Sequence, residues 1–569
     1  MKRDIENIFP KPNLLFAALF LVIILTPAYA SEENTLYIEN LTSISSIVNP
    51  ATLNLARSVN AAPEWRNFIP AQAFWSPDGS KLLIRSSIRW YKDDINFRPS
   101  NRNGIDAMYT LDADGTNFTR IVSNEINNRS TPIELPVPPD YNPWSPSGDK
   151  VVIDNGAFYI LADAGEDWLN VPGTNFSDMV SIVTNLSKIP RQRNFAWSPD
   201  GTRAVYTILD LEKSERKYIV KSEKLYVTDA DGSNIKQLAS EVNESFLGSI
   251  AWSHDGKQIA FRGKNLWIVN SDGTNLRQLG DCWGSTWSPD DSKLLCEVSE
   301  EVNDQFIRHL YLINVDSADK TEIIKSIGIE NPAWSPDGGS ILFVSVTERR
   351  NLGIFVSDSQ GRNVNLIYEE NNPLEKATLK AVSWSPDGSK IAFVSESGNW
   401  LYTINPDGTG KALITSNLSW IGDNPYAWSP SGDKIVFSSS IANGEHIFIA
   451  NPDGTERVQI TTGESKRYVL SGMGGSWSPD GSRLLIESSN DSPSRNEVLI
   501  AKLSGYDRTM PIRAPENINQ REVATPQQTV DATPTPAATA DAPKTPGFSI
   551  IFAGIMLIVT VFLMKRWNA

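Results

Sequence analysis

The amino-acid sequence predicts an all-β fold: a single large β-propeller of about eight to nine four-stranded blades, with an N-terminal signal before it and a C-terminal stalk and membrane helix after it. The main observation is a five-residue phrase, Trp-Ser-Pro-Asp-Gly or a close variant, which occurs nine times at spacings of 35 to 69 residues. Short apolar segments and Asp-Gly turns recur in step with the phrase, as in an array of one supersecondary unit. The nine phrases begin at Trp75, Trp144, Trp197, Trp252, Trp287, Trp334, Trp384, Trp428 and Trp477.

The repeat that spans residues 381–413 indicates how one blade is built. Residues 382–384 form a short apolar strand, and Pro386-Asp387-Gly388 forms a turn in which Pro presets φ, Asp bonds the backbone and Gly accepts a positive φ. Residues 391–394 and 400–404 are rich in β-branched and aromatic side chains and predict the second and third strands. A second Asp-Gly turn leads into a fourth strand. Four antiparallel strands per repeat predict a propeller blade.

The phrase, with a Leu-Tyr strand and an Asp-Gly-Thr turn further along the repeat, resembles the TolB-like β-propeller repeat, a WD40-like unit. The resemblance covers residues 71–512 and implies a propeller over that range. It implies no single activity, because the family spans periplasmic scaffolds, peptidase accessory domains and surface proteins. Each motif tryptophan occurs at the same place in its repeat, so we expect all nine to be blade-core residues that pack one blade onto the next.

Residues 1–30 have the features of a secretory signal peptide. Cations precede an apolar run at residues 14–25, and the small-x-small sequence that ends at Ala30 predicts cleavage between Ala30 and Ser31. A retained N-terminal membrane anchor is the alternative interpretation. Residues 31–70 are expected to form a lead-in to the propeller.

The other end predicts attachment to a membrane. Residues 513–546 are rich in Thr, Pro and Ala, a composition that cannot bury a core and predicts an extended linker. The segment 547–569 contains an apolar run, residues 547–564, which as a helix would reach about 27 Å and just cross a bilayer core. We therefore expect an exported cell-surface protein that is membrane-anchored through its C-terminus.

The order of these parts supports a processed anchor. A Thr/Pro-rich stalk, the motif Pro546, Gly547 and Phe548, a short apolar helix and a basic tail together resemble the archaeal PGF-CTERM surface-sorting signal. The resemblance implies that an archaeosortase removes the helix and that the protein is then attached to a membrane lipid. A plain single-pass anchor with a retained tail is the alternative.

Charge and sequence triplets constrain the partners. The formal net charge is −15, and a chain this acidic has no electrostatic footprint for nucleic acid. Export would also allow N-linked glycosylation, for which eight Asn-x-Ser/Thr triplets are candidates. The candidate residues are Asn40, Asn117, Asn128, Asn175, Asn185, Asn243, Asn417 and Asn490.

Two cysteines occur in the chain, and they flank the turn of one repeat. Counting outward from that turn places Cys282 and Cys296 opposite each other, or one diagonal apart, on neighbouring strands. A disulfide is one interpretation, since an exported protein meets oxidising conditions. Two small buried thiols are the other.

The sequence offers little for catalysis, and no catalytic or cofactor-binding residue is assigned. The three histidines, His254 in a repeat turn and His309 and His446 just before strands, have no metal-ligand spacing. No Gly-x-Ser-x-Gly elbow occurs. A Ser-His-Asp hydrolase is therefore not expected.

Calcium is the one cofactor considered. Two turns place a pair of carboxylates before a glycine, as the start of an EF-hand loop does, which makes Asp112, Asp114, Asp229 and Asp231 weak candidates. These loops lack the later acidic ligand and the flanking helices. Hairpin turns that use Asp and Gly for backbone geometry are the favoured interpretation.

Four segments break the period and are candidate binding loops, because binding groups concentrate in irregular segments on rigid scaffolds. They are residues 90–107, 124–141, 168–189 and 210–224. Tolerated surface insertions are the simpler interpretation. The favoured function is a protein- or glycan-binding or scaffolding module for a partner in the cell envelope. The alternative is an envelope enzyme, a glycan lyase or hydrolase, that uses carboxylates in the propeller channel.

Overall fold

The computed structural model divides the chain into two compact units, Met1–Asn517 and Ile518–Ala569, and every described residue lies in the first. The described residues are 37–43, 68–90, 103–117, 119–126, 143–154, 159–163, 192–213, 218–239, 249–263, 265–282, 284–303, 305–370, 379–395, 399–419, 425–441, 444–462, 466–470, 476–489 and 497–504. The predicted cleavage site (Ala30, Ser31), the linker 513–546 and the sorting motif (Pro546, Gly547, Phe548) lie outside them.

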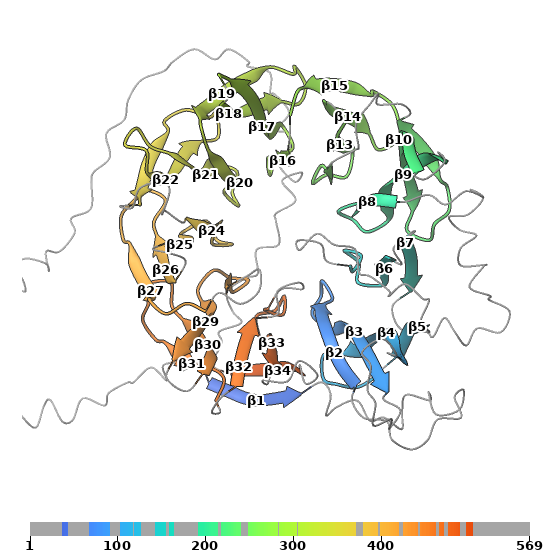
Figure 1. Ribbon diagram of the computed structural model, residues 1–569, viewed down its shortest axis with the longest axis vertical. Coiled ribbons are helices and arrows are strands. Elements are labelled where there is room, and N and C mark those ends of the chain that lie inside the picture. Colours follow the sequence, from blue (N-terminus) through green and yellow to red (C-terminus); the bar gives the residue numbers. More distant parts are fainter. Residues whose placement is uncertain are drawn as a thin grey trace, which may run out of the picture. The chain divides into compact units, whose positions relative to one another are not determined.

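The regular elements of the described residues are β-strands, as the sequence predicts, and the fold is an all-β propeller (Figure 1). Six sheets have four antiparallel strands each, in sequence order from one edge to the other. Three of these blades are β2 (Phe68–Trp75) to β5 (Thr119–Ile126) through β3 (Lys81–Trp90) and β4 (Asn103–Asp112); β8 (Gln192–Trp197) to β11 (Lys236–Ala239) through β9 (Arg203–Lys213) and β10 (Tyr218–Asp229); and β12 (Ile250–Trp252) to β15 (Arg277–Gly280) through β13 (Gln258–Arg262) and β14 (Leu266–Asn270).

The other three blades follow directly along the chain. They are β16 (Ser285–Trp287) to β19 (Lys320–Ser326) through β17 (Lys293–Val302) and β18 (Gln305–Asn314); β20 (Ile329–Trp334) to β23 (Asn365–Glu369) through β21 (Ser340–Val346) and β22 (Leu352–Asp358); and β24 (Lys380–Trp384) to β27 (Ala412–Thr415) through β25 (Ile391–Ser395) and β26 (Trp400–Ile404).

A seventh sheet has eight strands and joins the two ends of the propeller sequence. Its strands are β1 (Tyr37–Ser43), β28 (Tyr426–Trp428), β29 (Ile435–Ile441), β30 (Gly444–Ala450), β31 (Val458–Gln459), β32 (Lys466–Leu470), β33 (Arg483–Ser489) and β34 (Glu497–Ser504). A further small sheet has two strands, β6 (Lys150–Asp154) and β7 (Tyr159–Asp163).

The expected number of eight to nine four-stranded blades is therefore wrong. The described residues form six such blades and the eight-stranded sheet. The physical reason lies in the last two repeats: β32 pairs in parallel with β30, with Gly444 opposite Lys466 and Glu445 opposite Arg467, which fuses two repeats into one sheet. In addition, the repeat that begins at Trp144 contributes only β6, β7 and an isolated bridge to Val151 in the described part of the chain.

The hydrophobic core lies between neighbouring sheets. One cluster joins β12–β15 to β16–β19 and contains Ile268 and Leu294, and the next joins β16–β19 to β20–β23 and contains Leu312 and Phe343. Burying each such side chain contributes about 1.5–3 kcal/mol. A further cluster combines Trp75 of the first blade with residues of β33 and β34, so the series of sheets closes on itself.

The first strand strengthens this closure. β1 lies within the stretch expected to be a lead-in, and it pairs antiparallel with β34, from Tyr37 opposite Ser504 to Ser43 opposite Leu499. It thus occupies the free edge of the last sheet. The N-terminal and C-terminal parts of the propeller sequence are held together by backbone hydrogen bonds as well as by the core.

A hydrogen-bonded turn explains the repeated phrase. The hydroxyl of Ser385 donates to the carboxylate of Asp387 at 2.5 Å, and its oxygen accepts the N–H of Lys390 at 2.9 Å. The N–H of Gly388 donates to the carbonyl of Ser385 at 2.9 Å. The motif serines of all nine repeats are only 0–3% exposed. Serine and aspartate therefore recur because the buried serine hydroxyl needs an acceptor and the aspartate carboxylate provides it within the turn.

The motif tryptophans pack one blade onto the next. Seven of the nine are buried, and Trp384 and Trp428 are half-buried. Several indole N–H groups donate to the carbonyl just before the motif tryptophan of the preceding repeat. The bonds are Trp144 to Phe74 at 3.2 Å, Trp252 to Ala196 at 3.1 Å, Trp287 to Ala251 at 3.2 Å and Trp477 to Ala427 at 3.4 Å.

The motif turns also touch from repeat to repeat. Gly338 has a φ of +69°, and a Cβ placed on it would lie 3.4 Å from Cδ of Pro289 in the preceding repeat. At the closure, a Cβ on Gly79 (φ +70°) would lie 3.2 Å from Cδ of Pro479, which belongs to the last repeat. Glycine is thus required both for the left-handed backbone and for the close approach of the neighbouring proline.

Strand pairing continues into two of the period-breaking segments. β9 and β10 pair from Arg203 opposite Asp229 to Lys213 opposite Tyr218, which covers most of 210–224. β3 and β4 pair up to Trp90 opposite Asn103, which covers the ends of 90–107. The segment 168–189 lies outside the described residues. Within the described part of the chain, no helix is long and apolar enough to span a membrane.

Candidate functional site

The blade β16–β19 carries an extended hairpin. β17 and β18 have ten residues each, whereas β13 and β14 of the preceding blade have five each. The hairpin ends with Val302 opposite Gln305, and beside this tip Val302 and Phe306 are 38% and 64% exposed. Phe306 is the most exposed large apolar side chain among the described residues.

One side of this hairpin carries a polar cluster centred on a buried histidine. Nε2 of His309 lies 2.9 Å from Oε1 of Glu300, and Nδ1 lies 3.2 Å from Oε2 of Glu322. Lys325 donates to Glu300 at 2.9 Å, and the Tyr311 hydroxyl donates to Glu322 at 3.2 Å. The bonds from Lys325 and then His309 lower the pKa of the Glu300 carboxyl. This cluster therefore favours the charged form of the Glu300 carboxyl near the exposed tip.

The other side of the hairpin carries Glu297. Burial raises the pKa of its carboxyl, the charge of Arg308 lowers it and the charge of Glu330 raises it, with a net rise. Arg308 donates from Nη1 to the carbonyl of Ile329 at 2.8 Å, so these groups lie between β16–β19 and β20–β23. A half-buried carboxyl with a raised pKa beside a second carboxyl is an arrangement that can serve general acid catalysis.

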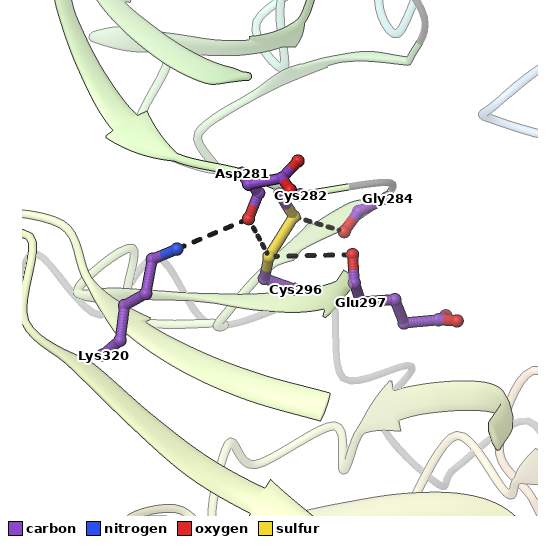
Figure 2. Close-up of a disulfide and its surroundings, with 6 residues drawn as sticks. All are labelled: Asp281, Cys282, Gly284, Cys296, Glu297 and Lys320. Atoms are coloured by element: carbon purple, nitrogen blue, oxygen red, sulfur yellow. Dashed lines mark hydrogen bonds between the residues drawn. A yellow bond between two sulfur atoms is a disulfide. The ribbon is translucent and has the colours of Figure 1, made fainter. Parts of the chain in front are cut away.

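A disulfide supports the base of the hairpin. Cys282 and Cys296 are bonded, with Cα atoms 5.5 Å apart, and both side chains are buried (Figure 2). The backbone carbonyls of Gly284 and Asp281 lie 2.9 and 3.5 Å from the two sulfur atoms. Figure 2 shows the Glu297 side chain directed away from the bond.

The bonded pair does not have the strand register expected from the sequence. Cys296 lies opposite Ser285, and Cys282 precedes β16, in the segment that connects it to β15. The expected register assumed that the strand before the turn extends as far as Cys282. β16 has only three residues and begins at Ser285, so Cys282 has no strand partner in β17. The disulfide therefore ties the connection between two blades to β17.

A substituted turn contact joins the same two blades. In the phrase that begins at Trp252, His254 stands at the proline position, and in the next phrase Asp291 stands at the glycine position. These are the two positions that touch from repeat to repeat elsewhere, as at Pro289 and Gly338. Asp291 keeps the left-handed backbone, with a φ of +58°, a conformation that aspartate adopts more readily than most residues.

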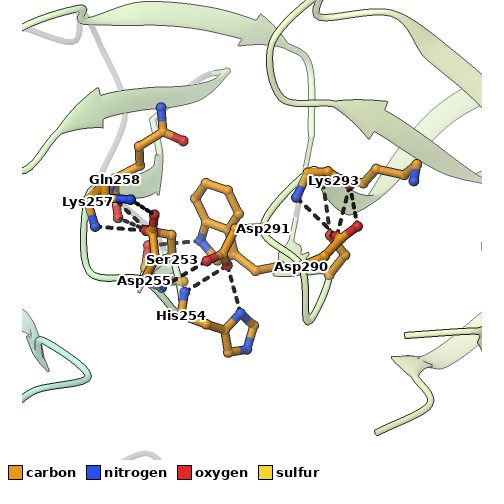
Figure 3. Close-up of polar contacts among 12 residues, drawn as sticks. Ser253, His254, Asp255, Lys257, Gln258, Asp290, Asp291 and Lys293 are labelled. Atoms are coloured by element: carbon orange, nitrogen blue, oxygen red, sulfur yellow. Dashed lines mark hydrogen bonds and ion pairs between the residues drawn. The ribbon is translucent and has the colours of Figure 1, made fainter. Parts of the chain in front are cut away.

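The replaced contact is polar (Figure 3). Nδ1 of His254 lies 2.8 Å from Oδ1 of Asp291, and the backbone N–H of His254 donates to the same oxygen at 2.7 Å. The N–H of Asp255 donates to Oδ2 of Asp291 at 2.8 Å. The side chain of His254 is 52% exposed and that of Asp291 is 16% exposed. One carboxylate therefore receives three bonds from the neighbouring turn.

The charges around this contact are set by hydrogen bonds. The bond to Asp291 raises the pKa of the His254 imidazole, and burial opposes the rise only in part. Burial would raise the pKa of the Asp255 carboxyl, but the bonds from the Lys257 N–H and the Ser253 hydroxyl outweigh it, and the pKa is lowered. The imidazole of His254 is thus more readily protonated than usual, and the Asp255 carboxyl beside it more readily ionised.

The calcium candidates lie in hydrogen-bonded turns. Asp114 accepts the N–H and hydroxyl of Thr116 at 2.9 and 2.6 Å, and Asp112 accepts the side-chain amide of Asn117 at 2.6 Å. Asp231 and Asp229 accept equivalent bonds from Ser233 and Asn234. In the described residues, no group of three or more His, Cys, Asp or Glu side chains is arranged to hold a metal ion.

Three of the glycosylation candidates fall within the described strands and turns. Asn117 and Asn417 are exposed, and Asn40 lies in β1. Asn417 sits in a tightly bonded segment, because its carbonyl accepts the N–H of Ser440 at 2.9 Å. The others, Asn128, Asn175, Asn185, Asn243 and Asn490, lie outside the described residues.

Sequence reasoning did not assign Glu297, Phe306 or Asp291 to a site. One signal was present for Asp291: the phrase at Trp287 ends in Asp rather than Gly, directly after the phrase in which His254 replaces Pro. No comparable signal in the sequence indicated the length of the β17–β18 hairpin, because that length depends on strand pairing that continues beyond the core.

With this geometry in place, a match to a known protein family can be reported for part of the chain. The sequence profile of the TolB beta propeller domain, PD40, matches residues 201–372. This part of the chain is similar to that domain. It includes β12–β15 and β16–β19, so the matched segment contains both the substituted turn contact and the hairpin.

Solved structures similar to the chain belong to several functional classes. TolB from Acinetobacter baumannii shares 16% identity, with 67% of this chain and 81% of that chain covered and a TM-score of 0.27. Dipeptidyl peptidase 4 from Porphyromonas gingivalis shares 14%, with 63% and 58% covered and a TM-score of 0.41. An oligogalacturonate lyase from Vibrio parahaemolyticus shares 15%, with 54% and 88% covered and a TM-score of 0.33.

These similarities do not extend to function at such identities and TM-scores. No curated protein matches the chain. The chain contains a β-propeller with a segment that matches the TolB beta propeller domain, and its own activity has to be inferred from its residues.

Proposed function

We propose that the chain is an exported, membrane-anchored cell-surface protein whose TolB-like propeller is a binding and scaffolding module for a protein or glycan of the cell envelope. The observation that carries this proposal is the exposed aromatic tip of the β17–β18 hairpin on a rigid frame. Phe306 is 64% exposed there. Aromatic side chains are enriched at binding interfaces, where they supply large contact areas at small entropic cost.

The frame supports this role because its polar groups are already engaged. The motif carboxylates accept bonds from their own turns, as Asp387 does from Ser385, and several indole N–H groups bond to the preceding repeat. Such a frame changes little on binding and holds its hairpins in fixed positions. The side chains that the hairpins expose then determine what the propeller binds.

The cellular setting rests on the terminal segments of the sequence. The signal features of residues 1–30 support export, and the motif at Pro546, Gly547 and Phe548 supports processing by an archaeosortase and attachment to a membrane lipid. The acidic composition supports an envelope partner rather than nucleic acid. Mass spectrometry of the mature C-terminus tests the anchor: an intact Lys565-Arg566 tail would contradict processing.

A binding screen tests the proposed function. The purified full chain is screened against envelope glycans and envelope proteins, and each hit is measured again with Phe306→Ala and with the control Leu413→Ala, which removes a 45% exposed side chain on another blade. We expect Phe306→Ala to weaken binding by about tenfold, roughly 1.4 kcal/mol, as for an interface aromatic. Leu413→Ala should bind as the unaltered chain does. Equal affinities for both variants would contradict the role of the hairpin.

The alternative, an envelope glycan lyase or hydrolase, is favoured by one observation, the raised pKa of Glu297 beside Glu330. The same screen therefore includes a turnover assay with each glycan hit. Turnover by the unaltered chain that is lost in Glu297→Gln would establish the alternative. Binding without turnover would support the binding module.

A further inference from the structure

At one junction between motif turns the contact is a histidine–aspartate pair. At several other junctions a glycine faces a proline of the preceding repeat, as Gly338 faces Pro289 and Gly388 faces Pro336, and at two it faces the residue after that proline, as Gly201 faces Ser147 and Gly432 faces Asp387. Between β12–β15 and β16–β19 both partners are replaced together, by His254 and Asp291. The two new side chains meet each other, with Nδ1 and Oδ1 2.8 Å apart. A paired replacement at touching positions indicates that the polar contact substitutes for the apolar one.

We propose that His254 and Asp291 form a pH-dependent latch between the blades β12–β15 and β16–β19, which is tight when the imidazole is protonated and loosens as the pH rises. The latch goes beyond the proposed binding function, because it concerns the junction beneath the displayed hairpin rather than the displayed surface.

The geometry explains why the imidazole matters at this junction. Asp291 accepts three hydrogen bonds from the turn of the preceding blade, two from backbone N–H groups and one from the imidazole. The backbone bonds remain at any pH. The imidazole adds a charge-assisted bond only when it carries a positive charge, and such bonds are stronger than neutral ones.

The charged groups that face His254 come from both turns. Asp291 lies on the turn between β16 and β17, and Asp255 lies on the turn of His254 itself. Lys257 pairs with Asp255 at 2.9 Å and offsets part of its charge. Asp290 accepts the Ser288 hydroxyl at 2.6 Å and stays within its own turn. Arg203 of the preceding blade donates to the carbonyl of Gly256 on the same turn at 3.2 Å. The charges of Asp291 and Asp255 both favour the imidazolium form of His254.

The direction of the pH effect follows from linkage. The bond to Asp291 raises the pKa of His254 in the folded chain. A group whose pKa is raised by folding contributes stability that is complete below its ordinary pKa and is lost as the pH rises through the folded value. For this histidine, the ordinary value is 6.5. The latch should therefore be closed at mildly acidic pH and weaken above pH 6.5.

Other turn contacts provide the matched control. Restoring the usual pair in His254→Pro with Asp291→Gly should rebuild the apolar contact seen at Pro289 and Gly338. Glycine also removes the strain of a left-handed backbone at position 291, where φ is +58°. The double variant keeps a contact between the blades but has no titrating group in it.

Hydrogen–deuterium exchange of the full chain tests the latch. Exchange of residues 251–258 and 287–293 is compared between the unaltered chain and the double variant at each pH from 5 to 9, so that the intrinsic pH dependence cancels. We expect the ratio of the two rates to rise as the pH passes through the folded pKa of His254. A constant ratio over this range would overturn the proposal.

A second measurement stays informative if the double variant does not fold. The chain has three histidines, which makes the ring signals countable by NMR. In the unaltered chain, His254 should titrate above its ordinary value, and in Asp291→Asn it should titrate lower, because the amide removes the charge but keeps the shape. An unchanged titration of His254 in Asp291→Asn would overturn the proposal.

Discussion

At the scale of single residues, each member of the repeated phrase has an identifiable task. The motif serine donates to the aspartate and accepts a backbone N–H, as Ser198 does with Asp200 at 2.6 Å and Arg203 at 2.9 Å. In the repeats in which Ser replaces the aspartate, a later residue takes over, as Asp149 does for Ser145 at 3.0 Å. The turn therefore depends on the hydrogen bond rather than on one fixed position for the acid.

The indole bonds between repeats predict different costs for two similar substitutions. Trp252 is 8% exposed and donates to the carbonyl of Ala196, whereas Trp334 is 9% exposed and its indole nitrogen has no hydrogen-bond partner among the described residues. Trp252→Phe should cost about 1–3 kcal/mol more than Trp334→Phe, since only the first leaves a carbonyl unpaired. Denaturant unfolding of both variants measures the difference, and equal losses would show that the indole bonds do not hold the blades together.

The sequence could predict these tryptophans but not the partners of His254. Each tryptophan recurs at one place in a regular repeat, and that regularity is enough to place it in the core of a blade. The contact of His254 with Asp291 requires knowing that the proline of one turn faces the glycine of the next, 37 residues further along. That relation is a property of the assembled propeller and is not visible within a single repeat.

At the scale of elements, the blades differ in the length of their strands. The short strands β12 to β15 stop where the core ends, whereas β17 and β18 continue and carry Glu297, Glu300 and Phe306. The segments that break the repeat period could be located from the sequence. Their structure could not, because β9 and β10 continue as paired strands through residues that look like a charged insertion.

The disulfide at the base of the β17–β18 hairpin predicts a change in stability. Cys282 and Cys296 are 14 residues apart, and a loop of this size restricts the unfolded chain by about 3 kcal/mol. Cys282→Ala with Cys296→Ala should lower the free energy of unfolding by roughly that amount, as measured in denaturant. Reductant acting on the unaltered chain should produce the same direction of change. An unchanged midpoint with both thiols shown to be free would contradict a stabilising role.

At the scale of the whole propeller, closure is the property on which the other conclusions depend. The first blade meets the last sheet through the cluster that contains Trp75 and Leu485, through Gly79 against Pro479, and through β1 on β34. The sequence predicts a propeller from its repeats alone. It does not predict the number of blades, because the parallel pairing of β30 with β32 depends on how the last two repeats meet.

The central claim is that the repeats close into a propeller through the pairing of β1 with β34, and hydrogen–deuterium exchange of the full chain tests it most directly. The exchange of Glu497–Ser504 is measured with residues 37–43 present and with them deleted, and β13 serves as the internal reference. The account predicts faster exchange along β34 and in β2 after the deletion, with β13 unchanged. Unaltered protection of β34 would contradict it.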